Sequence, residues 1–123
     1  MNILVTGAGG QLGKALRQIS ELSGHRCLFT DVRPEGEVVA LDITDGNSVA
    51  RMLDEYDIDI VVNCAAYTDV ERAETDVENA RRINAFASGV VAGEVARKNI
   101  SLIHVSTDYV FDGNRSEPYG EDA

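Results

Sequence analysis

Residues 1–17 decide the fold of this chain: MNILVTGAGGQLGKALR. A short apolar run over residues 3–5 leads directly into Gly7, Gly10 and Gly13, and a helical pattern follows. This order predicts a strand, a glycine turn and a helix. The unpaired N–H groups and the dipole at the start of such a helix bind a phosphate without any basic side chain. The stretch therefore predicts a site for the pyrophosphate of a dinucleotide.

Each of these glycines has a physical role. Gly7 allows the tight turn, Gly10 lets the backbone approach a phosphate, and Gly13 lets the helix pack closely on the strand. The spacing is G-x-x-G-x-x-G, and Gly9 does not restore the commoner G-x-G-x-x-G pattern. This looser spacing is similar to that of short-chain dehydrogenase/reductase enzymes. A glycine-rich turn that binds nothing remains the alternative.

Composition limits the class of protein. The chain has 123 residues, of which 44% are hydrophobic, and this size fits a single domain. It carries 11 Lys and Arg against 21 Asp and Glu, a formal net charge of −10. Such a surface repels nucleic acid and anionic membranes, so neither is expected as a partner. No metal ligands are predicted.

Two observations bear on where the protein works. The chain opens directly into a strand, with no secretion signal and no apolar run of membrane-spanning length. Cys27 and Cys64 both fall in predicted strands, where we expect them to be buried as small hydrophobic residues. Two such cysteines without a secretion signal indicate a reducing compartment, and we expect a cytoplasmic protein.

Strand and helix patterns alternate along the chain, which predicts an α/β fold. The apolar runs at 60–62 and 102–105 are typical of parallel strands buried on both faces. Right-handed crossovers then give a doubly wound parallel sheet of the Rossmann type with strand order 3-2-1-4-5, forming one dinucleotide-binding domain over 1–123. The predicted strands are 2–6, 25–31, 37–41, 58–64 and 101–106, and the predicted helices are 10–22, 46–56 and segments across 69–98.

The last helical region has two features of its own. Thr75 and Glu78 predict a capping box at the start of a long helix. Asn84 lies in an otherwise apolar inner stripe, where a buried amide needs hydrogen-bond partners. A bond to a nearby loop backbone and a supporting role beside the active site are both consistent with this position.

Polar residues at strand ends are candidates for adenosine binding. Asp31 closes the second strand, where an acid accepts hydrogen bonds from ribose hydroxyls and favours NADH, while Arg33 keeps NADPH open. After the third strand, Asp42 could accept from the exocyclic amine of adenine while Ile43 packs on the ring. A helix-capping role for Asp42 is the alternative.

Small and hydroxyl residues follow the fourth and fifth strands. Ala65 and Ala66 leave room for a cofactor at the carboxyl end of the fourth strand. Hydroxyls in Ser106-Thr107-Asp108 would reach the same crevice, where one could donate to a substrate carbonyl as hydride arrives. A turn or a cap is the alternative for this segment.

Together these segments resemble the dTDP-4-dehydrorhamnose reductases, an extended short-chain dehydrogenase/reductase family. The resemblance covers the whole chain and rests on residues 1–7, 10–13, 62–68, 73–74, 83–85 and, most specifically, Ser106-Thr107-Asp108-Tyr-Val-Phe-Asp-Gly113. It implies that NADH or NADPH reduces the 4-keto group of a dTDP-linked deoxy-hexulose to give dTDP-L-rhamnose, in an enzyme expected to be a homo-oligomer.

The resemblance also implies roles for matched positions. Thr107 takes the catalytic hydroxyl role, with Asp108 on the substrate side. The other matched residues would line the cofactor: Gly7, Gly10, Gln11, Leu12 and Gly13 at the pyrophosphate, Asp31, Asp42 and Ile43 at adenosine, and Ala65, Ala66, Tyr67 and Thr68 along the crevice.

One departure from the family is large. The family's Tyr-x-x-x-Lys pair and substrate domain have no counterpart in residues 1–123, since Gly113 and Ala123 stand four residues after Tyr109 and Tyr119. We therefore expect the cofactor half of a longer enzyme, inactive by itself. The alternatives are a non-catalytic regulatory protein of the same fold, and a sugar-nucleotide epimerase or dehydratase.

Overall fold

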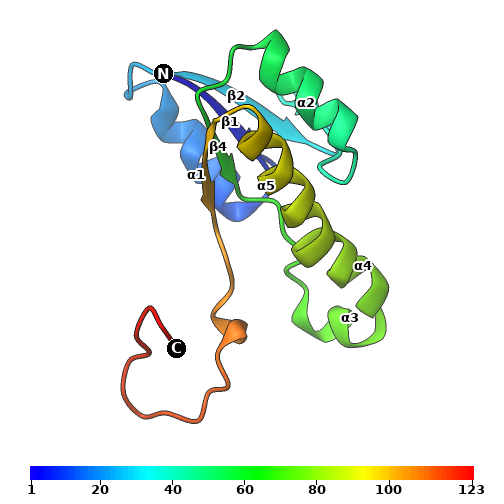
Figure 1. Ribbon diagram of the computed structural model, residues 1–123, viewed down its shortest axis with the longest axis vertical. Coiled ribbons are helices and arrows are strands. Elements are labelled where there is room, and N and C mark those ends of the chain that lie inside the picture. The colour runs from blue at the N-terminus through cyan, green and yellow to red at the C-terminus, as the bar shows by residue number, and fades with distance from the viewer.

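The computed structural model describes residues 1–123 as a five-stranded sheet flanked by helices (Figure 1). All strand pairs are parallel, and the order β3-β2-β1-β4-β5 confirms the predicted doubly wound topology. The strands are β1 (Asn2–Thr6), β2 (Arg26–Asp31), β3 (Val39–Ala40), β4 (Ile60–Asn63) and β5 (Ser101–His104). The helices are α1 (Gln11–Ser20), α2 (Gly46–Glu55), α3 (Val70–Thr75), α4 (Val77–Arg81) and α5 (Ala87–Arg97), with a π-helical turn at Arg82–Phe86 and a 3-10 helix at Asp108–Val110.

The hydrophobic core lies between the sheet and the helices α2 and α5. Leu4 and Val61 come from the central strands, and their register places them side by side on this face. They pack with residues of the two helices and of the loop after β3. Burial of these apolar side chains fixes α2 and α5 over the sheet, as Figure 1 shows. The remaining core residues are Leu41, Ile43, Val49, Leu53, Ile58, Ala87, Val91 and Val95.

The opposite face of the sheet is covered less completely. Only α1 connects strands on that side, and it contacts β2. Ile103 pairs with Val62 and is offset by one residue from the core-facing Leu102, so it points to this second face. Its side chain is 52% exposed, although parallel sheets are normally buried on both faces.

None of the helices combines the length and apolar character needed to span a membrane.

Several predicted strands are longer than the observed ones. The fifth strand ends at His104 rather than at residue 106, and the third is reduced to Val39–Ala40. The predicted capping box at Thr75 was also wrong, because Thr75 is the last residue of α3 and its hydroxyl donates to the carbonyl of Arg72. Asp69 caps α3 by accepting from the N–H of Arg72, and α4 starts after Asp76.

Both cysteines are free and only partly buried, so the prediction that they are buried core residues was too strong. Burial raises the pKa of the Cys64 thiol.

Beyond β5 the chain leaves the sheet and runs to the C-terminus through the 3-10 helix (Figure 1). Phe111 and Tyr119 stack within this last segment.

Candidate functional site at the carboxyl edge of the sheet

The glycine turn after β1 has the geometry that its spacing predicts. Gly7 has a φ of +67°, and a Cβ there would lie 2.6 Å from the backbone nitrogen of Ala65. A side chain at this position is therefore both strained and blocked. A Cβ on Gly13 would overlap the carbonyl of Gly7 and come within 2.6 Å of the Cα of Ala8. Gly13 thus lets α1 pack directly on the turn, just beyond the strand.

Gly10 differs from these two glycines because only one atom lies close to it. It is exposed, and a Cβ would meet only the Gly7 carbonyl, at 3.3 Å. Gly10 is the N-cap of α1, and no side chain caps this helix, whereas Asp45 caps α2 and Asp69 caps α3. The first N–H groups of α1, those of Gln11 and Leu12, therefore stand where an anion could accept from them.

Asp31 is bound to the glycine turn itself. Its Oδ2 accepts from the N–H of Gly9 at 2.9 Å, and its Oδ1 accepts from the N–H of Arg33 at 3.2 Å. The strand end and the turn are thereby joined through one carboxylate. The position predicted to bind the adenosine ribose thus lies next to the position predicted to bind the pyrophosphate.

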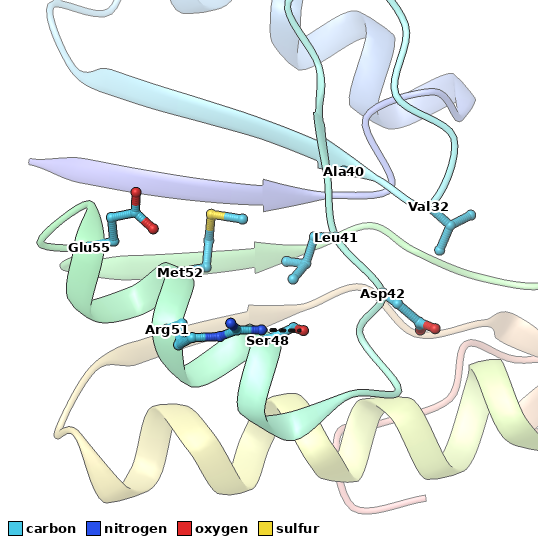
Figure 2. Close-up of a pocket in the computed structure, with 8 residues that line it drawn as sticks. All are labelled: Val32, Ala40, Leu41, Asp42, Ser48, Arg51, Met52 and Glu55. Atoms are coloured by element: carbon cyan, nitrogen blue, oxygen red, sulfur yellow. Dashed lines mark hydrogen bonds between the residues drawn. The ribbon is translucent and has the colours of Figure 1, made fainter.

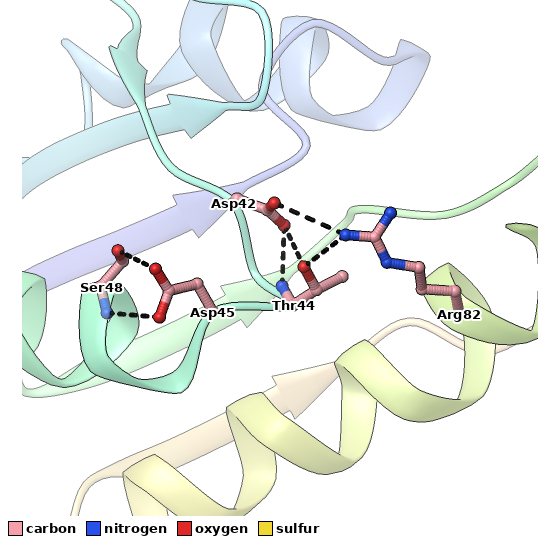
Figure 3. A network of polar contacts seen from close by, with 5 residues as sticks. All are labelled: Asp42, Thr44, Asp45, Ser48 and Arg82. Carbon is pink, nitrogen blue, oxygen red and sulfur yellow. Dashed lines mark hydrogen bonds and ion pairs between the residues drawn. The ribbon is translucent and has the colours of Figure 1, made fainter.

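Asp42 lies in a polar network after β3 (Figure 3). Its Oδ1 accepts from both the N–H and the hydroxyl of Thr44, at 2.9 and 2.7 Å, and Arg82 lies beside it. The hydrogen bonds from Thr44, with a smaller contribution from Arg82, hold the pKa of Asp42 below its usual value. The alternative of a helix cap was wrong for Asp42, because Asp45 caps α2 through the N–H groups of Asn47 and Ser48.

A groove runs between the β3 edge and α2, next to Asp42 (Figure 2). Asp42 and Val32 lie at one end of it, where β2 and β3 end. Ile43, in contrast, is 5% exposed and belongs to the core cluster, so most of its side chain faces away from solvent. The residues that line the groove are Val32, Ala40, Leu41, Asp42, Ser48, Arg51, Met52 and Glu55.

The loop after β4 is held by the helical region that follows it. Asn84 bonds both backbone groups of Tyr67: its Oδ1 accepts from the N–H at 2.8 Å and its Nδ2 donates to the carbonyl at 3.1 Å. The Tyr67 hydroxyl donates to Asp76 at 3.1 Å. Burial and this bond raise the pKa of Tyr67. The expected bond from Asn84 to a loop backbone is confirmed, although Asn84 is exposed rather than buried.

The π-helical turn explains why Asn84 departs from the predicted inner stripe. The turn covers Arg82–Phe86 and holds more residues than an α-helical turn, because its hydrogen bonds join residues five apart. The side chains before α5 are therefore rotated relative to those of a continuous α-helix. Asn84 is thereby directed to the loop after β4 rather than to the core. Such turns are often found at functional sites. Beside this loop, Ala65 is partly buried, while Ala66 and Thr68 are exposed.

Thr107 follows β5 and is exposed. It is the N-cap of the 3-10 helix, where its Oγ1 accepts from the N–H of Tyr109 at 3.2 Å. The hydroxyl also lies 3.4 Å from Asp108 Oδ1, to which it can donate. The segment therefore forms a cap, and the hydroxyl stays accessible at the carboxyl edge of the sheet.

A row of polar side chains across the strand ends, buried at Thr6 and Asn63 and exposed at His104, was not predicted. The hydroxyl of Thr6 donates to Asn63 Oδ1 at 2.5 Å, and Asn63 Nδ2 lies 3.1 Å from His104 Nδ1. Thr6 pairs with Asn63 and Asn63 pairs with His104 in the sheet register. The row places hydrogen bonds between side chains of β1, β4 and β5, under the loops that carry the candidate site.

The chain matches one protein family over its whole length. The family described as RmlD substrate binding domain matches residues 1–123. The chain belongs to this family. It is 41% identical over 125 residues to the "Probable low-salt glycan biosynthesis reductase Agl14" of Haloferax volcanii, covering 98% of this chain and 42% of that protein.

Two solved structures support the family assignment. A dTDP-4-dehydrorhamnose reductase from Clostridium acetobutylicum is 36% identical with a TM-score of 0.87, covering 98% of this chain and 41% of that one. The same enzyme from Bacillus anthracis, in complex with NADP, is 35% identical with a TM-score of 0.83, covering 94% and 39%. The chain thus spans about two fifths of the length of the relatives it matches.

Proposed function

We propose that residues 1–123 form the dinucleotide-binding domain of a reductase that uses NADH or NADPH. The enzyme would reduce the 4-keto group of a dTDP-linked deoxy-hexulose to give dTDP-L-rhamnose. The glycine turn carries this proposal, because it presents an uncapped helix N-terminus at the carboxyl edge of a parallel sheet. The family match and the NADP complex of the Bacillus anthracis relative support the choice of cofactor and reaction class.

The proposed cofactor contacts follow the arrangement of the site. The pyrophosphate would lie on Gly7–Gly13, with Gln11 and Leu12 donating their N–H groups. Asp31 and Asp42 would accept from the ribose and from adenine, with the backbone of Ile43 beside them. The loop Ala65–Thr68 would line the crevice. Thr107 would donate to the substrate carbonyl, and Asp108 would contact the substrate.

We also propose a cytoplasmic location, with which the two free cysteines are consistent.

Gly10→Val tests the site directly. Its side chain would occupy the place of the phosphate, so we expect the affinity for NADH and NADPH to fall at least about tenfold. The fold should tolerate the change with a small shift of the turn, because the Gly7 carbonyl, at 3.3 Å, is the one atom close to the added Cβ. Calorimetric titration up to millimolar cofactor measures the loss, and Gly120→Val is the control, since nothing lies within 4 Å of its Cβ. Equal affinities for Gly10→Val and the wild type would contradict the proposal.

We further propose that the chain forms homo-oligomers through the sheet face that α1 covers only in part. Ile103 exposes apolar surface there, which a second copy could bury. The net charge of −10 opposes association, but at ordinary ionic strength salt screens the repulsion between charges more than about 10 Å apart. Light scattering over a dilution series should show a dimer or larger species that Ile103→Lys dissociates. Leu22→Lys, at an 88% exposed position, is the control. A monomer at every concentration would refute this.

A further inference from the structure

Arg82 opens the π-helical turn and reaches the loop after β3 (Figure 3). Its Nη2 donates to Thr44 Oγ1 at 3.1 Å and lies 3.9 Å from Asp42 Oδ2. Thirty-eight residues of chain separate Arg82 from Thr44, so this is a tertiary contact between two parts of the fold. Neither the glycine motif nor the strand-end pattern accounts for it.

Thr44 transmits this contact to Asp42. Its hydroxyl accepts from Arg82 and donates to Asp42 Oδ1, so the three side chains form a directed chain of hydrogen bonds. A hydroxyl has one proton to donate, and a donor that binds one of its lone pairs restricts the direction of that proton. Arg82 therefore orients the Thr44 hydroxyl toward the carboxylate. Figure 3 shows the Arg82 guanidinium facing both residues.

The two oxygens of Asp42 are used differently as a result. Oδ1 accepts from the N–H and the hydroxyl of Thr44. Oδ2 has no hydrogen-bond donor, since the nearest cation is 3.9 Å away, and the side chain is 51% exposed. One oxygen is thus bound to the protein, while the other is free to accept from a ligand at the end of the groove that Val32 also lines.

We propose that Arg82 is a positioning residue for adenine recognition: through Thr44 it holds Asp42 so that Oδ2 accepts from the exocyclic amine of the base. This inference rests on the proposed dinucleotide function. The π-helical turn that carries Arg82 also carries Asn84, which holds the backbone of Tyr67. One irregular turn therefore holds both the loop at the proposed adenosine site and the loop after β4.

The test compares two neighbouring arginines and two ligands. Arg82→Gln removes the contact, while Arg81→Gln alters an exposed arginine at the end of α4. Each variant is titrated with NADH and with its 6-oxo analogue, in which an oxo group replaces the exocyclic amine. The wild type should bind NADH about tenfold more tightly than the analogue, because the analogue cannot donate to Asp42.

Arg82→Gln should reduce this preference about two- to fivefold, whereas Arg81→Gln should leave it unchanged. Thr44→Val should reproduce the effect, and adding Arg82→Gln to Thr44→Val should change the preference no further, because both act on one chain of bonds. Thermal unfolding without ligand separates this effect from general destabilisation, which would weaken NADH and the analogue equally.

An unchanged preference in Arg82→Gln would overturn the inference. If both affinities fell equally while thermal stability stayed the same, Arg82 would instead attract a phosphate of the ligand directly. If the wild type bound neither NADH nor NADPH, the proposed function itself would fail. Failure of the inference about Arg82 alone would instead leave wild-type binding intact.

Discussion

Gly7→Ala is expected to lower the free energy of unfolding by about 3 kcal/mol, the sum of backbone strain and overpacking. The residue has a φ of +67°, which alanine adopts poorly, and the new Cβ would lie 2.6 to 2.7 Å from backbone atoms of Cys64 and Ala65. Backbone atoms cannot move aside as the end of a flexible side chain can. Urea denaturation followed by circular dichroism measures the loss.

Gly89→Ala is the matched control for this prediction. Gly89 lies in α5, is exposed, and has nothing within 4 Å of an added Cβ. Alanine there should raise stability by about 0.5–1 kcal/mol, because it favours the helix. The two substitutions add the same methyl group with opposite expected signs. A Gly7→Ala protein as stable as the wild type would show that the turn can change its path.

Thr107→Val should lower kcat by about 10²–10³-fold in a reductase of the relatives' length that carries this segment. Valine keeps the size of threonine but removes the hydroxyl that we propose donates to the developing oxyanion. The KM for NADH should stay within about twofold, since the effect falls on the reaction step rather than on binding. Steady-state kinetics with varied cofactor and sugar nucleotide measures both quantities.

The cap formed by Thr107 requires a second variant. Valine also removes the acceptor for the N–H of Tyr109, so part of the effect could come from a disturbed 3-10 helix. Thr107→Ser keeps both the hydroxyl and the cap, and it should retain most of the turnover. If Thr107→Val and Thr107→Ser were equally active, the residue would be a cap alone.

The architecture could be predicted from sequence because its determinants are local. The apolar runs around Leu4, Val61 and Leu102 and the helices between them specify a parallel sheet, and right-handed crossovers leave few possible orders. The glycine turn could be predicted for the same reason, since φ at Gly7 and the close approach at Gly13 are properties of one short segment.

Strand ends could not be predicted as well, because pairing partners determine them. Val105 and Ser106 have strand-like character in the sequence, yet the ladder between β4 and β5 stops at Asn63 and His104. The third strand is shorter still, since only Val39 and Ala40 find partners on β2. A pattern of side chains carries no information on where the neighbouring strand ends.

The polar contacts of the site were the least predictable part. Regular helical periodicity across 69–98 placed Asn84 in a buried stripe, whereas the break at Asp76 and the π-helical turn direct it to Tyr67. The bond from Arg82 to Thr44 also depends on this turn. Residues 82–86, RINAF, include no Pro or Gly that would mark such a turn in the sequence.

The bond between Asp31 and Gly9 limits how the proposed cofactor preference could be redesigned. An acid at the end of the second strand binds the ribose 2′-hydroxyl, so accepting a 2′-phosphate there requires removing its charge. Here the same carboxylate accepts from the N–H of Gly9, inside the turn proposed to bind the pyrophosphate. An apolar replacement would relieve repulsion at the ribose but release the turn one residue before the helix cap. Asparagine or serine, which keep an acceptor oxygen without the charge, are therefore better starting points for engineering than alanine.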